Sequence, residues 1–550
     1  MKLLELKNFK AIYNNRDNED LKELAQDIRN FLNDFVNQNN GHIGSNLGVV
    51  ELTLSILSYF DLDDSIVLFD TGHQSHIYKL LVHGIEKFKT IKEYNGLSNF
   101  QEISESEYDW ISTGHSSTSI AYQFGYAIAN NKKNIISIIG DAAFYGSYTH
   151  PGLINLQNID KKTITILNDN NQAIGKNALA IKDIKKYVES IGIKYIKCEN
   201  GHDFEELFNS FDQANNSNEH VFIHCITKKA HGYDGKNELF ENHSIEPINN
   251  NSYSKLIAQE IENNFTNNDY LICPAMISSS NFLNLQNKFK KNVIDVGINE
   301  EFSILTASAI ANSNKKTFIS IYSTFFQRIF DQLVHDVFRN NLPMTFLIDR
   351  GGLSFSGGVS HHGIYDISLI NNFENSIICQ PYSVNDVKVL AKQAYLNTHK
   401  QFFLRYENLA AIEDKSQEKF KIGQWQELIF DENNTLTLIA YGNILEEFYN
   451  IIREKKLNIN LINARYINPI DEEMIKKHRN NIIFVYEQVI NKNNLFSNMK
   501  FKFDNLNLHS FSFESRNIKH GNKEFLLEEF NMNVESIIKR IFEVPKKCKL

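Results

Sequence analysis

The apolar residues in the first half of this chain predict strands that alternate with helices. From Gly41 to about residue 245, short β-rich runs at 134–139, 163–167 and 221–226 alternate with segments of helical periodicity. This alternation is typical of a parallel sheet that is covered by helices on both faces. Ahead of it, residues 17–38 predict an amphipathic helix, whose apolar face is formed by Leu21, Leu24, Ile28, Phe31, Leu32 and Phe35.

The same alternation returns in the rest of the chain. A polar stretch, Pro247–Ser254, is the best candidate for a linker before it. We expect strands at 292–297, 316–322, 344–349 and 376–379, separated by helices at 300–312, 325–340 and 383–397. A third series has strands at 435–442, 459–467 and 482–486. The sequence therefore predicts three α/β domains with mostly parallel sheets, at residues 1–248, 249–412 and 413–550.

Composition narrows the class of protein. The 550 residues are 42% hydrophobic, yet no apolar run reaches the roughly 18 residues of a membrane span. The five cysteines show no C-x-x-C spacing, so neither a disulfide framework nor a zinc site is indicated. The net charge is −9, with acidic and basic residues mixed along the chain. We expect a soluble cytoplasmic protein that binds neither nucleic acid nor membranes.

Two polar side chains follow neighbouring apolar runs in the first series. Asp141 comes directly after the run 135–139 and Gly140, and Asn170 follows the run 164–167. Because parallel strands end at one edge of a sheet, we expect these side chains to lie close together. A carboxylate and an amide oxygen suit Mg²⁺ that is shared with a diphosphate, which is the pattern of a thiamine diphosphate motif. Ordinary loop caps after two strands are the alternative.

Longer blocks resemble the 1-deoxy-D-xylulose-5-phosphate synthase family, which is related to transketolase. The resemblance covers nearly the whole chain, and its blocks occur in the order that the family has them. They include Gly41–Thr53, Asp70–Gln74, Thr113–Ser119, Asp295–Glu300, Tyr322–Arg328 and Asp349–Leu353.

The resemblance implies a transketolase-like fold that binds thiamine diphosphate and Mg²⁺. It also implies a homodimer that condenses pyruvate with D-glyceraldehyde 3-phosphate, with loss of CO₂, to give 1-deoxy-D-xylulose 5-phosphate. By this resemblance Glu300 is the carboxylate at N1′ of the aminopyrimidine, and Tyr322 and Phe325 pack against that ring. A first-turn glutamate and core aromatics are the alternatives, and Arg328 is expected to be an ion-pair partner.

The resemblance assigns the remaining site residues as well. His42, His243 and His361 take catalytic roles, since imidazole titrates near neutrality. Arg350 would bind the acceptor's phosphate, and Gln172 would offer a backbone carbonyl to Mg²⁺. The other cofactor contacts that it implies are His73, Gly114, His115, Ser116, Ala142, Ala143 and Tyr233.

Residues expected on the acceptor side depart from the family pattern. Gly357 stands where the family has an aspartate, and Asn408 where it has a second phosphate-binding arginine. Losing such a charge-assisted contact costs about 1.5–3 kcal/mol. Ala142 replaces a glycine, and Glu301–Phe302 replaces a Gln-His pair. Two alternatives therefore stay open: a thiamine diphosphate carboligase or transketolase-like enzyme with another acceptor, and a non-catalytic paralogue.

Overall fold

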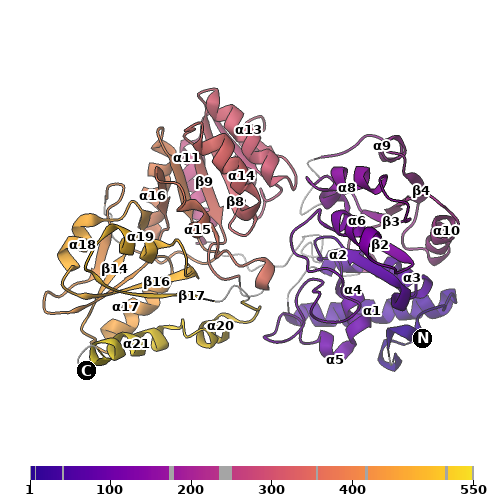
Figure 1. Cartoon of the computed structure of the whole chain (residues 1–550), viewed down its shortest axis with the longest axis horizontal. Helices are drawn as coiled ribbons and strands as arrows, with labels where there is room; N and C mark the ends of the chain where they lie inside the picture. Colours follow the sequence, from indigo (N-terminus) through magenta and orange to yellow (C-terminus); the bar gives the residue numbers. More distant parts are fainter. Residues whose placement is uncertain are drawn as a thin grey trace. The chain divides into compact units, whose positions relative to one another are not determined.

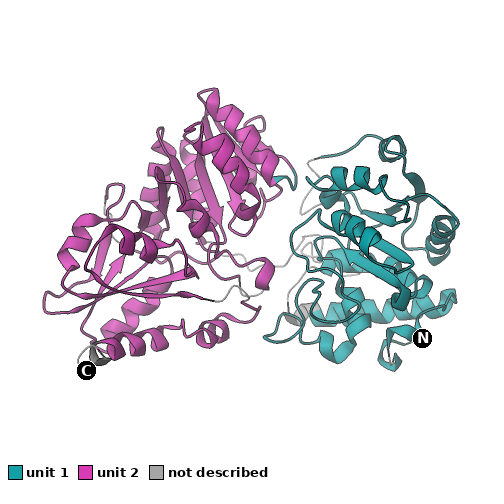
Figure 2. Cartoon of the chain, in the orientation of Figure 1, with its two compact units in different colours: residues 1–247, 297–299 teal, residues 248–296, 300–550 magenta. Residues whose placement is uncertain are grey.

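The computed structural model describes residues 2–6, 8–39, 43–172, 179–233, 251–354, 357–414, 419–514 and 518–547. These residues form two compact units (Figures 1 and 2). Unit 1 comprises residues 1–247 and 297–299, and unit 2 comprises residues 248–296 and 300–550. His42, His243 and the first half of the expected linker lie outside the described residues.

Unit 1 is built on a five-stranded sheet in which all strands are parallel. The strand order is β1 (Ser65–Phe69), β2 (Asn134–Gly140), β3 (Ile164–Asp169), β5 (Val221–Ile226) and β4 (Lys194–Cys198). The runs at 134–139, 163–167 and 221–226 were predicted as strands, and the structure confirms them. These strands are rich in Ile and Val because both faces of the sheet are buried.

Helices cover the two faces of this sheet with separate apolar clusters. Side chains of α1 (Asn18–Asn39), α3 (Val50–Tyr59), α4 (His76–His83) and α10 (Phe204–Asn215) fill one cluster. On the other face lie α6 (Ser119–Ala129), α8 (Thr149–Leu156) and α9 (Ile184–Ser190). Short helices complete the unit: α2 (Ile43–Leu47), α5 (Ile85–Phe88) and α7 (Asp141–Phe144), with 3₁₀ turns η1 (Leu3–Glu5), η2 (Phe9–Ala11) and η3 (Leu62–Asp64).

Unit 2 contains two sheets. The larger has the order β15 (Tyr466–Asn468), β10 (Ser376–Cys379), β11 (Gln401–Arg405), β9 (Thr345–Asp349), β8 (Lys316–Tyr322), β6 (Asp269–Cys273) and β7 (Val293–Asp295), and only β15 pairs antiparallel. The smaller has the order β12 (Gln426–Ile429), β14 (Ile459–Asn463), β13 (Leu436–Ala440), β16 (Ile482–Ile490) and β17 (Asn507–Phe513), with β12 antiparallel. One apolar cluster joins the two sheets, with buried residues from Tyr253 to Met499.

Helices flank both sheets of unit 2. The larger sheet carries α11 (Tyr253–Asn264), α12 (Leu283–Lys288), α13 (Glu300–Asn312), α14 (Phe330–Gln332), α15 (Asp366–Ile370) and α16 (Val384–Leu396), and the turn η7 (Gly358–Ser360) follows β9. The smaller sheet carries α17 (Ile444–Glu454), α18 (Glu472–His478), α19 (Leu495–Lys502), α20 (Lys523–Glu529) and α21 (Val534–Lys547). No helix among the described residues combines the length and the apolar character that crossing a bilayer requires.

Two predicted elements are divided in the structure, and the strand predicted at 482–486 extends to Ile490 as β16. The expected helix at 325–340 is divided into a 3₁₀ turn η5 (Phe325–Ile329), α14 and a π-helical turn η6 (Leu333–Phe338). Its buried residues Ile329, Leu333 and Val337 are spaced by four, and a wider turn keeps all three in the core. The expected strand at 459–467 is two strands, because the chain leaves β14 and pairs with β10 as β15.

Candidate active site

The ends of β2 and β3 bring the predicted metal ligands together in unit 1. Asp141 begins α7 directly after β2, and Asn170 follows the last residue of β3. The backbone N–H of Gln172 donates to Asp141 Oδ2 and to Asn170 Oδ1, each at 3.0 Å. The carboxylate and the amide oxygen therefore lie at the same turn, where both are near enough to share one N–H donor. The other oxygen of Asp141 accepts the N–H of Ala142 at 2.8 Å.

His73 lies beside this turn, between the buried residues Gly72 and Gln74. A Cβ built on Gly140 would lie 3.9 Å from His73 Cε1, which places the imidazole next to the end of β2. Asn46 holds the loop, since its side chain donates to His73 O and accepts from His76 N, both at 2.9 Å. Burial, with Lys229 nearby, lowers the pKa of His73 to about 4. The ring is therefore neutral at pH 7.

The loop with Gly114, His115 and Ser116 is organised by an aspartate that the sequence analysis did not single out. Asp70 follows β1, is fully buried and accepts the backbone N–H groups of Ser117 at 2.7 Å and Ser119 at 2.9 Å. Burial raises the pKa of Asp70, and these hydrogen bonds oppose the shift. The sequence signal for this role was the position of Asp70 directly after an apolar run, which is also the position of Asp141.

The remaining predicted contacts of unit 1 are buried or partly buried. Ala143 is buried and Ala142 partly buried in α7. His115 is partly buried and Ser116 buried. Tyr233 is partly buried at the end of the described segment 179–233, packed against the core that contains α1.

Unit 2 contains the predicted catalytic carboxyl group. Glu300 begins α13 and is 2% exposed. Burial raises its pKa, and the Arg328 guanidinium, with Nη1 at 3.3 Å from Glu300 Oε2, opposes the shift. Arg328 is thus the ion-pair partner that was expected. A raised pKa favours the protonated form of a carboxyl group, which suits it to proton exchange with a nearby base.

Aromatic side chains gather in the same unit around Tyr322 at the end of β8. Its ring stacks on Phe325 with centroids 5.8 Å apart, and the His361 ring meets Phe325 edge-on at 6.0 Å. The Arg350 guanidinium lies 3.9 Å from the Tyr322 ring centroid. Arg350 Nη1 also donates to Asp349 Oδ2 at 2.7 Å. Four residues predicted for the site, from three segments of the chain, are therefore neighbours.

The structure shows what surrounds Gly357 and Asn408, the two acceptor-side residues that depart from the family pattern. A Cβ on Gly357 would lie 2.6 Å from His361 Cβ and 2.6 Å from Ser354 Oγ, so this backbone has no room for an aspartate. Asn408 is exposed. Arg405 does not substitute for the missing arginine, because it is 1% exposed and its guanidinium binds Asp366, Gln380 and the carbonyl of Gly363.

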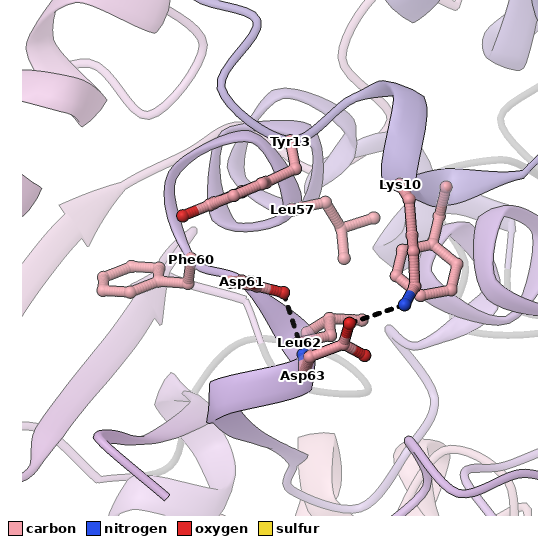
Figure 3. A pocket seen from close by; sticks show the side chains of 8 residues that line it. Lys10, Tyr13, Leu57, Phe60, Asp61, Leu62 and Asp63 are labelled. Atoms are coloured by element: carbon pink, nitrogen blue, oxygen red, sulfur yellow. Dashed lines mark hydrogen bonds and ion pairs between the residues drawn. The ribbon is translucent and has the colours of Figure 1, made fainter.

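Figure 3 shows a small cavity in unit 1 that is separate from these residues. Its volume is about 100 Å³, well below the roughly 300 Å³ at which small-molecule sites begin. Its charged side chains already have partners, since Lys10 Nζ lies 2.5 Å from Asp63 Oδ2 and Asp61 accepts the backbone N–H of Asp63. The lining residues are Phe9, Lys10, Tyr13, Leu57, Phe60, Asp61, Leu62 and Asp63, none of which is a predicted site residue.

Comparison with known proteins gives matches along the whole chain. Residues 4–190 match the family model described as 1-deoxy-D-xylulose-5-phosphate synthase. Residues 258–410 match the transketolase pyrimidine binding domain, and residues 426–537 match the transketolase C-terminal domain.

Two relatives named 1-deoxy-D-xylulose-5-phosphate synthase match end to end. The one from Clostridium beijerinckii is 32% identical, over 99% of this chain and 100% of its own. The one from Malacoplasma penetrans is 32% identical, over 95% of this chain and 96% of its own. Among solved structures, transketolase from Campylobacter jejuni covers 96% of this chain and 100% of its own at 16% identity and a TM-score of 0.47. The family assignment rests on the sequence matches alone.

Proposed function

The chain belongs to the 1-deoxy-D-xylulose-5-phosphate synthase family, and we propose that it is a working synthase of that kind. It would condense pyruvate with D-glyceraldehyde 3-phosphate, release CO₂ and form 1-deoxy-D-xylulose 5-phosphate, a precursor for isoprenoids. The observation that carries the proposal is the convergence of Asp141 Oδ2 and Asn170 Oδ1 on the N–H of Gln172. These hydrogen bonds bring both predicted metal ligands to the same turn.

The donor set of unit 1 fits a magnesium diphosphate. Asp141 and Asn170 would bind Mg²⁺ through their side-chain oxygens, and Gln172 through its backbone carbonyl. The rest of the cofactor's diphosphate and thiazolium would lie against His73, Gly114, His115, Ser116, Ala142, Ala143 and Tyr233. When bound, thiamine diphosphate supplies a nucleophilic carbon that adds to the carbonyl of the donor substrate.

Glu300 would hold a proton at N1′ of the aminopyrimidine. Burial raises the pKa of Glu300, which favours the protonated carboxyl group and supports its sharing a proton with a ring nitrogen. Arg328 would keep the carboxyl group oriented. Tyr322 and Phe325, already stacked on each other, would pack against the ring.

Histidines would handle protons of the substrates, and Arg350 would bind the acceptor's phosphate. His73 would act as a neutral hydrogen-bonding group, since its pKa of about 4 leaves it uncharged. His361 lies beside Phe325 and would face the reacting atoms. His42 and His243, outside the described residues, are proposed for the same task by family resemblance.

We also propose a cytoplasmic homodimer with domains at 1–248, 249–412 and 413–550. Each unit leaves an apolar helix surface exposed: Tyr122 (45%) and Ile128 (61%) on α6, and Phe302 (57%) and Leu305 (45%) on α13. Apolar helix surfaces of this kind are typical of subunit interfaces. A second copy of the chain would cover them.

The proposal is tested by pyruvate-dependent CO₂ release with thiamine diphosphate and Mg²⁺, measured with and without D-glyceraldehyde 3-phosphate. We expect release that the acceptor strongly stimulates, and a product with the mass of 1-deoxy-D-xylulose 5-phosphate. Glu300→Ala should abolish it. Absence of release under all conditions would favour the non-catalytic paralogue, and unchanged activity of Glu300→Ala would refute the role of Glu300.

A different acceptor is the second candidate, because Asn408 is exposed and uncharged and Arg405 is fully engaged elsewhere. If glyceraldehyde 3-phosphate is the acceptor, Asn408→Arg should restore a phosphate contact and lower its KM by about tenfold or more. Initial rates at varied acceptor concentration measure this, with Asn408→Gln as the uncharged control. An unchanged KM would point to an acceptor without a phosphate.

A further inference from the structure

Three polar side chains on adjacent strands of unit 1 form a chain of hydrogen bonds toward the proposed metal ligands. Tyr195 on β4 and His224 on β5 meet through Tyr195 Oη and His224 Nδ1, 2.8 Å apart. His224 Nε2 lies 2.8 Å from Asp169 Oδ2 at the end of β3. Since β5 lies between β3 and β4 in the sheet, the chain crosses three strands.

The direction of these hydrogen bonds is determined by the groups themselves. Burial raises the pKa of Tyr195 to about 12, so the phenol keeps its proton at neutral pH and donates it to Nδ1. Asp169 Oδ2 is a carboxylate oxygen and accepts from His224 Nε2. The imidazole therefore accepts at Nδ1 and donates at Nε2, and a single neutral tautomer satisfies both neighbours.

Asp169 connects His224 to the loop that follows β3. Its second oxygen, Oδ1, accepts the N–H of Asn171 at 3.0 Å, and its backbone carbonyl accepts the N–H of Thr227 at 2.9 Å. Asn171 has φ of +57°, so the backbone reverses there. This reversal brings the Gln172 N–H to Asn170 Oδ1 and Asp141 Oδ2.

We propose that Tyr195 and His224 are positioning residues for the metal loop: through Asp169 they hold Asn170 in the orientation that binds Mg²⁺. This inference rests on the proposed function, because it assumes that Asn170 is a metal ligand. Side chains that orient a metal ligand without touching the metal commonly change affinity by about 10–100-fold when removed.

Mg²⁺ affinity in the presence of thiamine diphosphate tests the inference, measured by calorimetric titration of the full-length protein. We expect His224→Leu to raise the Kd for Mg²⁺ by about 10–100-fold. His224→Gln, whose amide nitrogen can replace Nε2 as the donor to Asp169, should recover most of the affinity. Tyr195→Phe removes only the hydroxyl group and should weaken binding by a few-fold.

His220 offers a matched control at the opposite end of β5. It is 8% exposed, as His224 is, and also makes two hydrogen bonds, to Thr163 and to the carbonyl of Ile159. His220→Leu should lower the melting temperature as much as His224→Leu while leaving the Kd for Mg²⁺ within about twofold of the parent's. Equal loss of affinity in both variants would overturn the inference.

A second readout needs no cofactor. Amide hydrogen exchange in the loop 169–172 should be faster in His224→Leu than in His220→Leu, because only the former releases Asp169. If exchange in this loop were unchanged, and His224→Leu and Tyr195→Phe bound Mg²⁺ as tightly as the parent, the positioning role would be refuted. The proposed function would stand. If the parent protein itself bound neither thiamine diphosphate nor Mg²⁺, the proposed function would fail first, and the inference with it.

Discussion

His76 shows how burial determines the charge of a single side chain. It is 5% exposed at the start of α4, and its Nε2 donates to the carbonyl of Asn99 at 3.0 Å. Burial lowers its pKa to about 3, with Lys92 as a smaller cause. Burial likewise lowers the pKa of His73 and of His362, each to about 4. These three imidazoles are therefore neutral at pH 7.

Acid should therefore destabilise the protein through His76, and His76→Gln should remove that contribution. The unfolded chain gains a proton at this histidine below its ordinary pKa of 6.5, whereas the folded protein does so only near 3. Stability thus falls as the pH falls through that window, by up to about 1.4 kcal/mol per pH unit. Glutamine keeps an N–H donor for Asn99 but does not titrate.

Urea unfolding between pH 7 and 4.5 measures this difference. The free energy of unfolding of the parent should fall, relative to that of His76→Gln, as the pH drops below 6.5. His150→Gln, at an exposed histidine, is the control and should follow the parent. Parallel curves for the parent and His76→Gln would show that His76 gains its proton in the folded state as easily as in the unfolded one.

Arg405 shows how one side chain can join several elements. From β11 its Nε binds Asp366 Oδ2 in α15 at 2.8 Å, and Nη2 donates to the carbonyl of Gly363 at 2.8 Å. Nη1 binds Gln380, which follows β10. Arg405 is 1% and Asp366 0% exposed, so the two charges compensate each other away from water. The planar guanidinium explains why arginine suits this place.

Arg405→Met should destabilise unit 2 strongly, by about 3–5 kcal/mol, because it leaves the Asp366 carboxylate buried without the positive charge that compensates it. Thermal or urea unfolding would measure the loss. Arg405→Lys should recover only part of it, since an ammonium group cannot reproduce the three contacts. Arg479→Lys, at an exposed arginine, serves as the control. A loss below about 1 kcal/mol, typical of surface ion pairs, would contradict this account.

The two units differ in how many sheets share one apolar core. Unit 1 has one sheet between separate clusters, whereas in unit 2 a single cluster joins the sheet around β8 to the sheet around β13. Trp425 belongs to that shared cluster and its indole N–H donates to the carbonyl of Tyr466 at 2.7 Å. We infer that the two sheets of unit 2 unfold together.

The two tryptophans allow a test, since Trp110 belongs to unit 1 and Trp425 to unit 2. In Trp110→Phe only Trp425 remains, and its fluorescence in urea should report one cooperative transition for both sheets of unit 2. The parent's fluorescence should contain a further contribution from unit 1, with its own midpoint. Two resolved steps in Trp110→Phe would mean that the sheets of unit 2 separate before they unfold.

Much of the fold could be predicted from local pattern. Helical periodicity and short apolar runs depend on neighbouring residues alone, so the observed α1, β2, β3, β8 and α16 match their predicted positions within two residues at each end. The convergence of Asp141 and Asn170 was predictable too, because consecutive parallel strands end at one edge of a sheet.

Contacts between distant segments depended on the tertiary structure. The sequence shows an apolar run at 459–467, but only the free edge of β10 decides that its end becomes β15. Likewise nothing local couples Tyr195 and His224 to Asp169. The physical reason is that backbone periodicity is a property of adjacent residues, whereas a hydrogen bond or a clash across the fold exists only once strands are paired. The sequence by itself therefore determined the elements, the family and the proposed ligands, and the tertiary structure decided how those ligands are held.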